Sequence, residues 1–231
     1  MARQSRAFAP GVPQLVMHRS ASGAHLSLAD DDLDVLLALI SAQTLARRIP
    51  VHAYSLNADR LMLVTAASTA ASLSGAMQSI ARHFADHLQD RHDMSRPVFD
   101  GRFRSAVIEP GAAVLETMRF VEQQGLPESV ADPGSSSSPT QARTSAGHHL
   151  GLERRVWLVD PIEYWNLGNT PFDRQQAWRT LIAAPLAVDQ AMRIESALRG
   201  GWWIGSGAPP ESATRPLLPG VRGRPKKDVP K

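Results

Sequence analysis

The chain of 231 residues contains no cysteine. Disulfide bonds and thiolate metal sites are therefore excluded, which is typical of proteins kept in a reducing compartment such as the cytoplasm. The longest apolar run, 35–40, is far too short to span a membrane. The opening residues, MARQSRAFAPGVP, lack the apolar segment of a secretory signal. We therefore expect a cytoplasmic protein with no membrane partner.

Lysine is rare. The chain has three lysines, and all of them lie in the last six residues. With Arg222 and Arg224, and against Asp228, they give the segment 222–231 a formal charge of +4, whereas the whole chain carries +3. The remainder therefore carries about −1. A basic surface outside this tail has to come from the places where arginines cluster.

The strongest strand signal is a hairpin in the first third of the chain. Residues 51–56 and 60–64 are rich in β-forming side chains, and 57–59 supplies a turn. A further strand is predicted over 14–19, and an apolar strand follows Ser105. These segments predict four strands in the first half of the chain.

Helices are predicted between these strands from apolar residues at helical spacing. They cover 30–48, the stretch from Ser68 or Thr69 to about residue 90, and 111–124. The order β-α-β-β-α-β-α predicts the α+β class. We expect a ferredoxin-like antiparallel sheet with helices on one face, followed by a small helical C-terminal region.

Composition divides the chain into four parts. Residues 1–125 are predicted to form the ferredoxin-fold domain, and 126–150 a linker rich in proline and serine. Residues 151–206 are predicted to form the helical C-terminal region, and 207–231 the basic tail.

Several motifs, in order along the chain, resemble those of the REP-associated tyrosine transposases, a group of HUH single-strand DNA transposases. They are His52-Ala53-Tyr54, Met77-Gln78 with Arg82 and Arg91-His92, Gly101-Arg102-Phe103 with Ser105, YWNLGNTPFDRQQAWRTLI at 164–182 and GGWWIGS at 200–206. The resemblance implies a DNA-binding protein of the nucleoid whose partner is single-stranded or hairpin DNA. It also implies a homodimer.

The chemistry of that family depends on residues that this chain lacks. The family uses Mg²⁺ or Mn²⁺ to polarise a phosphate, and a tyrosine attacks it. The resemblance places the metal-binding His-x-His pair at Arg60 and Met62, the tyrosine at Phe120 and a third ligand at Gln124. Arginine repels a cation, a thioether is too soft for Mg²⁺, and phenylalanine has no attacking oxygen. We therefore expect no catalytic residue, no metal site and no cofactor.

An active transposase remains the alternative. It would cleave and rejoin hairpin DNA through an unrecognised nucleophile, and Mg²⁺ or Mn²⁺ would then be expected. The chain has only two tyrosines: Tyr54 is interpreted as a sheet aromatic and Tyr164 as a packing residue, with a relocated nucleophile at Tyr164 as a remote alternative. His83 and His87 are interpreted as a surface pair, and His148-His149 as a loop feature.

Arginines and the basic tail are the candidates for DNA contact. On the body of the protein we expect phosphate contacts from Arg102, Arg104 and Arg119. In the tail, an RGRP core resembles an AT-hook, whose extended arginines follow a narrow minor groove. Its candidate residues are Arg222, Arg224, Lys226 and Lys227. Trp202-Trp203 could stack on bases, but a place in the core is favoured. The predicted function is DNA binding without catalysis.

Overall fold

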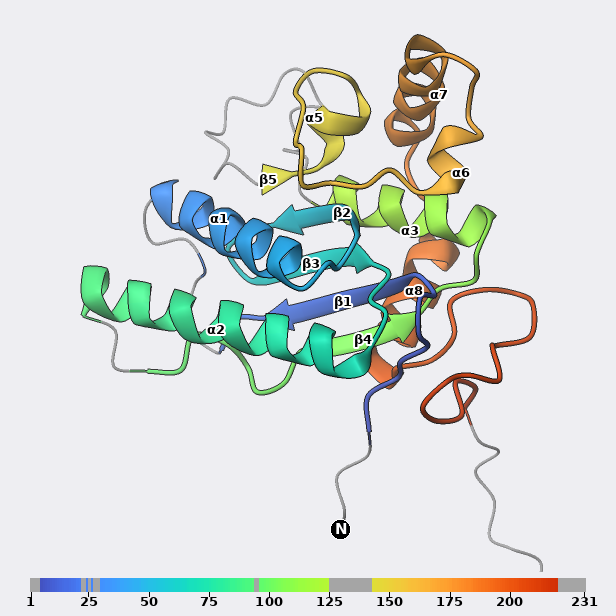
Figure 1. Cartoon of the computed structure of the whole chain (residues 1–231). Coiled ribbons are helices and arrows are strands. Elements are labelled where there is room, and N and C mark those ends of the chain that lie inside the picture. Colours follow the sequence, from blue (N-terminus) through green and yellow to red (C-terminus); the bar gives the residue numbers. More distant parts are fainter. Residues whose placement is uncertain are drawn as a thin grey trace, which may run out of the picture.

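The fold is built on a five-stranded antiparallel sheet with the order β4-β1-β3-β2-β5 (Figure 1). A computed structural model of the chain describes residues 5–21, 24, 26, 30–93, 96–124 and 143–219. The strands are β1 (Gln14–Arg19), β2 (Val51–Leu56), β3 (Arg60–Thr65), β4 (Arg104–Val107) and β5 (Arg143–Thr144). The predicted hairpin and the antiparallel α+β class are confirmed.

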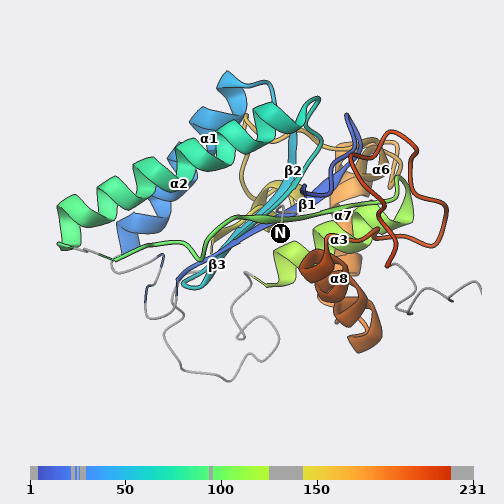
Figure 2. The same ribbon diagram turned by 90° about the horizontal axis from the view of Figure 1, so that it is seen from below.

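One face of the sheet is covered by α1 (Asp30–Ala46) and α2 (Ala70–His92), as Figure 2 shows. Thr69 is the N-cap of α2, and its side chain accepts a hydrogen bond from the Ser72 backbone N–H at 3.1 Å. The predicted apolar stripe of α2 is entirely buried against the sheet and α1. Helix α1 connects β1 to β2, and α2 connects β3 to β4. With the strand order β4-β1-β3-β2, these connections are those of a ferredoxin-like domain.

Helices also cover the second face, which the sequence analysis did not anticipate. They are α3 (Ala112–Gln123) and α8 (Val188–Gly200), with α7 (Pro171–Ala183) packed on α3 (Figures 1 and 2). This face is apolar, since Leu15, Met62, Val64 and Ala106 pack there against α3 and α8. A sheet with two apolar faces needs a cover on each, so the C-terminal region completes the core.

The predicted linker, 126–150, lies mostly outside the described residues. Its last part, 143–150, forms β5, which pairs with β2, and the short helix α5 (Ala146–His149). A two-residue strand has no periodicity to detect, so only its tertiary pairing reveals it. A further short helix, α6 (Ile162–Trp165), follows. Among the described residues, no helix has the length and apolarity needed to cross a membrane.

Candidate functional site

The register of the sheet gathers five side chains on the face covered by α3 and α8. Met17 of β1 lies opposite Met62 of β3 and Arg104 of β4, and Arg19 lies opposite Arg60. Residues two apart on a strand point to the same face. The two methionines and three arginines therefore form neighbouring rows on one surface.

This surface is the floor of a cavity of about 220 Å³, which we call the arginine pocket. Its walls are Phe120 from α3 and three residues of α8, namely Glu195, Leu198 and Arg199. Phe120 is 2% exposed and Met62 is fully buried. Arg60, Met62 and Phe120 thus line one pocket, although they come from different elements.

The charge of the arginine pocket is strongly unbalanced. Four arginines line it with one acid, Glu195. Among the described residues, no side-chain hydrogen bond or ion pair involves Arg19, Arg104 or Arg199, all of which are exposed. Arg60 contacts Asp59 only at 3.9 Å. Exposed, unpaired arginines gathered in a concave site attract an anion such as a phosphate.

The basic surface continues beyond the arginine pocket. A neighbouring cavity of about 280 Å³ shares Arg104 and Arg199 with it and adds Arg102, which is exposed. The other arginines of that cavity have protein partners. Arg6 stacks 3.7 Å from the centre of the Phe103 ring, and Arg215 donates to the carbonyls of Gly200 and Gly201.

The other predicted site residues lie elsewhere. Arg119 does not line the arginine pocket, and its guanidinium donates to the Ala184 carbonyl after α7. Gln124, which follows α3, is half-buried and is not part of the pocket lining either. The tail candidates, Arg222, Arg224, Lys226 and Lys227, lie outside the described residues.

The residues present do not fit the divalent ion that the resemblance implies. Arg60 offers only cationic donors, and the Met62 thioether is a poor ligand for Mg²⁺ or Mn²⁺. Phe120 carries no nucleophilic atom. We therefore derive no step through a metal ion at these positions.

Neither tyrosine lines the arginine pocket. Tyr54 is fully buried on β2 and stacks on Trp157, and burial raises the pKa of its hydroxyl. Tyr164 is 5% exposed and donates its hydroxyl to the His149 carbonyl at 2.7 Å. Burial raises the pKa of Tyr164 to about 12. Both positions agree with the packing roles predicted for these residues.

A buried polar cluster on the same side of the sheet was missed by sequence reasoning. Glu122 of α3 is fully buried, and its Oε1 lies 2.5 Å from both Ser145 Oγ and His149 Nδ1. Its Oε2 accepts a hydrogen bond from Trp178 Nε1 at 2.9 Å. The interpretation of His148-His149 as a loop feature is wrong for His149, which has no exposed surface.

The charge state of His149 follows from this enclosure. Burial alone lowers the pKa of His149, but the adjacent Glu122 carboxylate and the Asp160 carboxylate outweigh burial and raise it to about 9. The one sequence signal of this cluster is an acid, Glu122, on the apolar side of a helix. Its partners are distant in the chain, so only the fold shows where the acid is satisfied.

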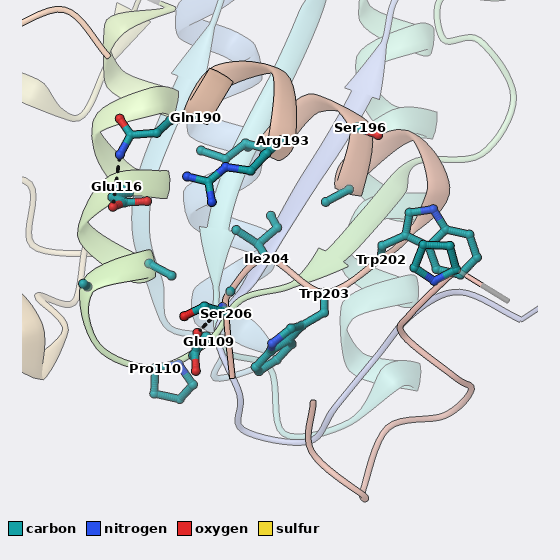
Figure 3. A pocket seen from close by; sticks show the side chains of 16 residues that line it. Glu109, Pro110, Glu116, Gln190, Arg193, Ser196, Trp202, Trp203, Ile204 and Ser206 are labelled. Atoms are coloured by element: carbon teal, nitrogen blue, oxygen red, sulfur yellow. Dashed lines mark hydrogen bonds between the residues drawn. The ribbon is translucent and has the colours of Figure 1, made fainter. Parts of the chain in front are cut away.

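Another cavity, of about 610 Å³, lies between α3, α8 and the segment that follows α8 (Figure 3). Its polar groups are largely engaged with one another: Glu109 accepts from the backbone N–H of Ser206 and Gly207, and Gln190 donates to Glu116. Trp203 is buried and donates to the Gly207 carbonyl at 3.0 Å, so its expected core role is confirmed. This cavity has no comparable excess of one charge.

Known proteins offer few matches to this chain. No protein-family model matches the chain. No curated protein matches it. It is similar to a solved structure described as a REP-associated tyrosine transposase bound to a REP hairpin, with 11% sequence identity and a TM-score of 0.45. The match covers 61% of this chain and 90% of the other. This likeness is too distant to carry an argument about function.

Proposed function

We propose that the chain is a DNA-binding protein of the REP-associated tyrosine transposase type that holds DNA phosphates but does not cut DNA. The observation that carries the proposal is the arginine pocket. Arg60, Met62 and Phe120, where the resemblance places the metal ligands and the nucleophile, meet in a cavity lined by four arginines. The site has lost the groups for strand cleavage and keeps groups that bind an anion.

Binding in this pocket is proposed to need no metal ion. A guanidinium stays protonated at any physiological pH and can grip a phosphate through two parallel N–H···O bonds. Arg19, Arg60 and Arg104 present such groups from three neighbouring strands. Arg102 extends the same surface, so several successive phosphates of one strand can be contacted.

The proposed partner is single-stranded or hairpin DNA, as the motif resemblance suggests. A homodimer and a place in the nucleoid stay predictions. Light scattering with and without DNA tests the dimer, and a monomer mass at high protein concentration under both conditions contradicts it.

The pocket is tested by fluorescence-anisotropy titration of a labelled DNA hairpin. We expect the double variant Arg104→Ala/Arg199→Ala to bind about tenfold or more weakly. The slope of log K against log salt should fall by about 1.4 for two phosphates of the single-stranded loop and by about 1.8 for two of the duplex stem, because the variant neutralises two fewer phosphates. Chelation of divalent ions with EDTA should leave wild-type affinity unchanged.

The matched control removes the same charge elsewhere. Arg82→Ala/Arg179→Ala changes two exposed arginines on α2 and α7 that line neither arginine-rich cavity. Its affinity should stay within about threefold of wild type. Equal reductions of affinity in the two double variants would show that overall charge, and not this pocket, determines binding.

The alternative, an active transposase, predicts that hairpin DNA is cleaved. Under the proposed function, a nicking assay on hairpin DNA with Mn²⁺ is expected to show no cleavage. Cleavage that disappears in Tyr164→Phe but persists in Tyr54→Phe would establish the alternative, with Tyr164 as the nucleophile.

The tail is proposed as a second DNA-binding segment, separate from the pocket. Residues 222–231 carry a formal +4. Removing them should lower the salt slope by about 0.7 for each phosphate of a single strand that the tail neutralises. Identical affinities and slopes for full-length and truncated protein would exclude the tail from the interface.

A further inference from the structure

Two histidines and an aspartate converge where α5 meets the segment before α6. One ring nitrogen of His148, one of His149 and a carboxylate oxygen of Asp160 lie within 4.8 Å of one another. Asp160 Oδ1 is 3.3 Å from His148 Nε2 and 3.5 Å from His149 Nε2. Two ligands at the usual bond lengths on a tetrahedral zinc ion are about 3.3 Å apart. Both histidine–aspartate distances therefore match the spacing of two ligands on one zinc ion, and the two ring nitrogens lie within 4.8 Å of each other.

The ring of His149 is oriented as a metal ligand would be. Its Nδ1 lies 2.5 Å from Glu122 Oε1, so the Nδ1 proton is donated to that carboxylate. When the ring is neutral, as it must be to bind a metal ion, the lone pair of Nε2 faces Asp160. A metal-binding histidine almost always donates its other ring N–H to a carboxylate, carbonyl or water, which fixes the ring in this way.

The facing atoms of His149 and Asp160 are not satisfied by each other. His149 Nε2 and Asp160 Oδ1 are buried, and neither has a hydrogen-bond partner among the described residues. If a proton on Nε2 alone joined them, a charge-assisted bond of about 2.7–2.9 Å would be expected. The observed 3.5 Å is longer than that and suits two atoms that bind the same ion.

We propose that His149, Asp160 and His148 bind one divalent transition-metal ion of the zinc class. Imidazole and carboxylate ligands suit such an ion, and the chain has no cysteine to offer a thiolate. The site is distinct from the arginine pocket and does not depend on the proposed function.

His148 and Asp160 also line a cavity of about 660 Å³, together with Tyr164, Trp165 and Arg174. This cavity gives the ion access to solvent and leaves a coordination position for water. Bound there, the ion joins α5 to the segment before α6. Through Glu122 it is tied to α3, so it stabilises the docking of the C-terminal region on the sheet.

The three ligands are expected to contribute unequally. His148 Nδ1 accepts a hydrogen bond from the Arg155 backbone N–H at 3.1 Å, which places the proton of a neutral ring on Nε2. Coordination through Nε2 requires that proton to move and the Arg155 hydrogen bond to change. We therefore expect Asp160 and His149 to dominate the affinity and His148 to add less.

The test is calorimetric titration of Zn²⁺ into the tag-free full-length protein after treatment with EDTA and its removal. One ion per chain is expected. Asp160→Asn keeps the side-chain shape and should weaken binding by at least about tenfold, with a smaller reduction in His148→Ala. His83→Ala, which changes an exposed histidine on α2, is the control and should bind as wild type does.

Two further readouts cover the buried ligand. Co²⁺ should give the visible absorption of a low-symmetry tetrahedral site in wild type and lose it in Asp160→Asn. Zn²⁺ at about a hundred times its Kd should raise the wild-type melting temperature by about 5 to 10 °C. His149→Gln should abolish both effects if it folds, and Asp160→Asn decides the question if it does not. Absence of binding, or equal affinity of wild type and Asp160→Asn, would overturn the proposal.

Discussion

The two faces of the sheet use the same strands for different chemistry. Toward α1 and α2, β3 presents Leu61 and Leu63 to a closed apolar core. Toward α3 and α8, the same strand presents Arg60 and Met62 to the arginine pocket. Successive side chains of a strand point to opposite faces. Substitutions at alternate positions can therefore change the chemistry of one face and leave the core behind it intact.

Each helical layer also buries one carboxylate, and the two carboxylates differ in enclosure. Asp32 of α1 is fully buried and lies 3.0 Å from the Nε2 atoms of His87 and His92 of α2, whose side chains are 22% and 21% exposed. Glu122 of α3 has partners with no exposed surface: Ser145, His149 and Trp178. If Asp32 is removed, water can bond to the partly exposed His87 and His92. If Glu122 is removed, water cannot reach its fully buried partners.

The largest expected effect is on Glu122. Glu122→Ala should lower the free energy of unfolding by about 3–5 kcal/mol, because the charged His149 loses its nearest carboxylate and the buried Trp178 indole N–H loses its acceptor. Urea unfolding measures the change. Glu116→Ala on the same helix is the control. Its side chain accepts only a 3.4 Å bond from Gln190, and its removal should cost less than about 1 kcal/mol.

Asp32 should matter less. Asp32→Ala is expected to lower the free energy of unfolding by about 1–3 kcal/mol, because the partly exposed His87 and His92 regain water when their acceptor is removed. The same urea series measures it. A destabilisation as large as that of Glu122→Ala would mean that enclosure of the partners does not govern the cost.

The smallest effect concerns a histidine on the α1 and α2 side that has no carboxylate in contact. The pKa of His18 is lowered, chiefly by burial and to a smaller extent by the charge of Arg6. The hydrogen bond with the Gly101 carbonyl and the charge of Asp100 oppose this lowering. The folded state therefore binds this proton less readily than the unfolded state does. The stabilisation is present above about pH 6.5, the unfolded value, and is lost as pH falls below it.

This predicts a lower melting temperature at pH 5 than at pH 7. The part of that difference due to His18 should vanish in His18→Gln, while His83→Ala, which changes an exposed histidine, should behave as wild type. An undiminished pH difference in His18→Gln would assign the effect to other groups.

Much of the first layer was predictable from local patterns. The hairpin, the Thr69 cap and the buried stripe of α2 follow from β-forming residues, a capping side chain and helical spacing. These signals lie within a few residues of one another, so no knowledge of the distant chain is needed. The motif resemblance also identified Arg60, Met62 and Phe120, which line one pocket.

The charge of that pocket was not predictable in the same way. Arg19 and Arg199 join Arg60 and Arg104 through strand register and the docking of α8, and neither was a candidate. Arg119, which was a candidate, turns instead to the Ala184 carbonyl. A periodic pattern tells which side of its own element a residue occupies but not which other elements meet there.

By itself, the sequence determined the order of the first four strands and the helices between them, the absence of cysteine and the residue types at 60, 62 and 120, because each is a property of residue type or short spacing. Only the tertiary structure decided that both faces of the sheet are covered and that Glu122, His149 and Asp160 form a chain of close contacts. Those contacts join residues of α3, α5 and the segment before α6, and their energy depends on shared burial, which no local pattern records.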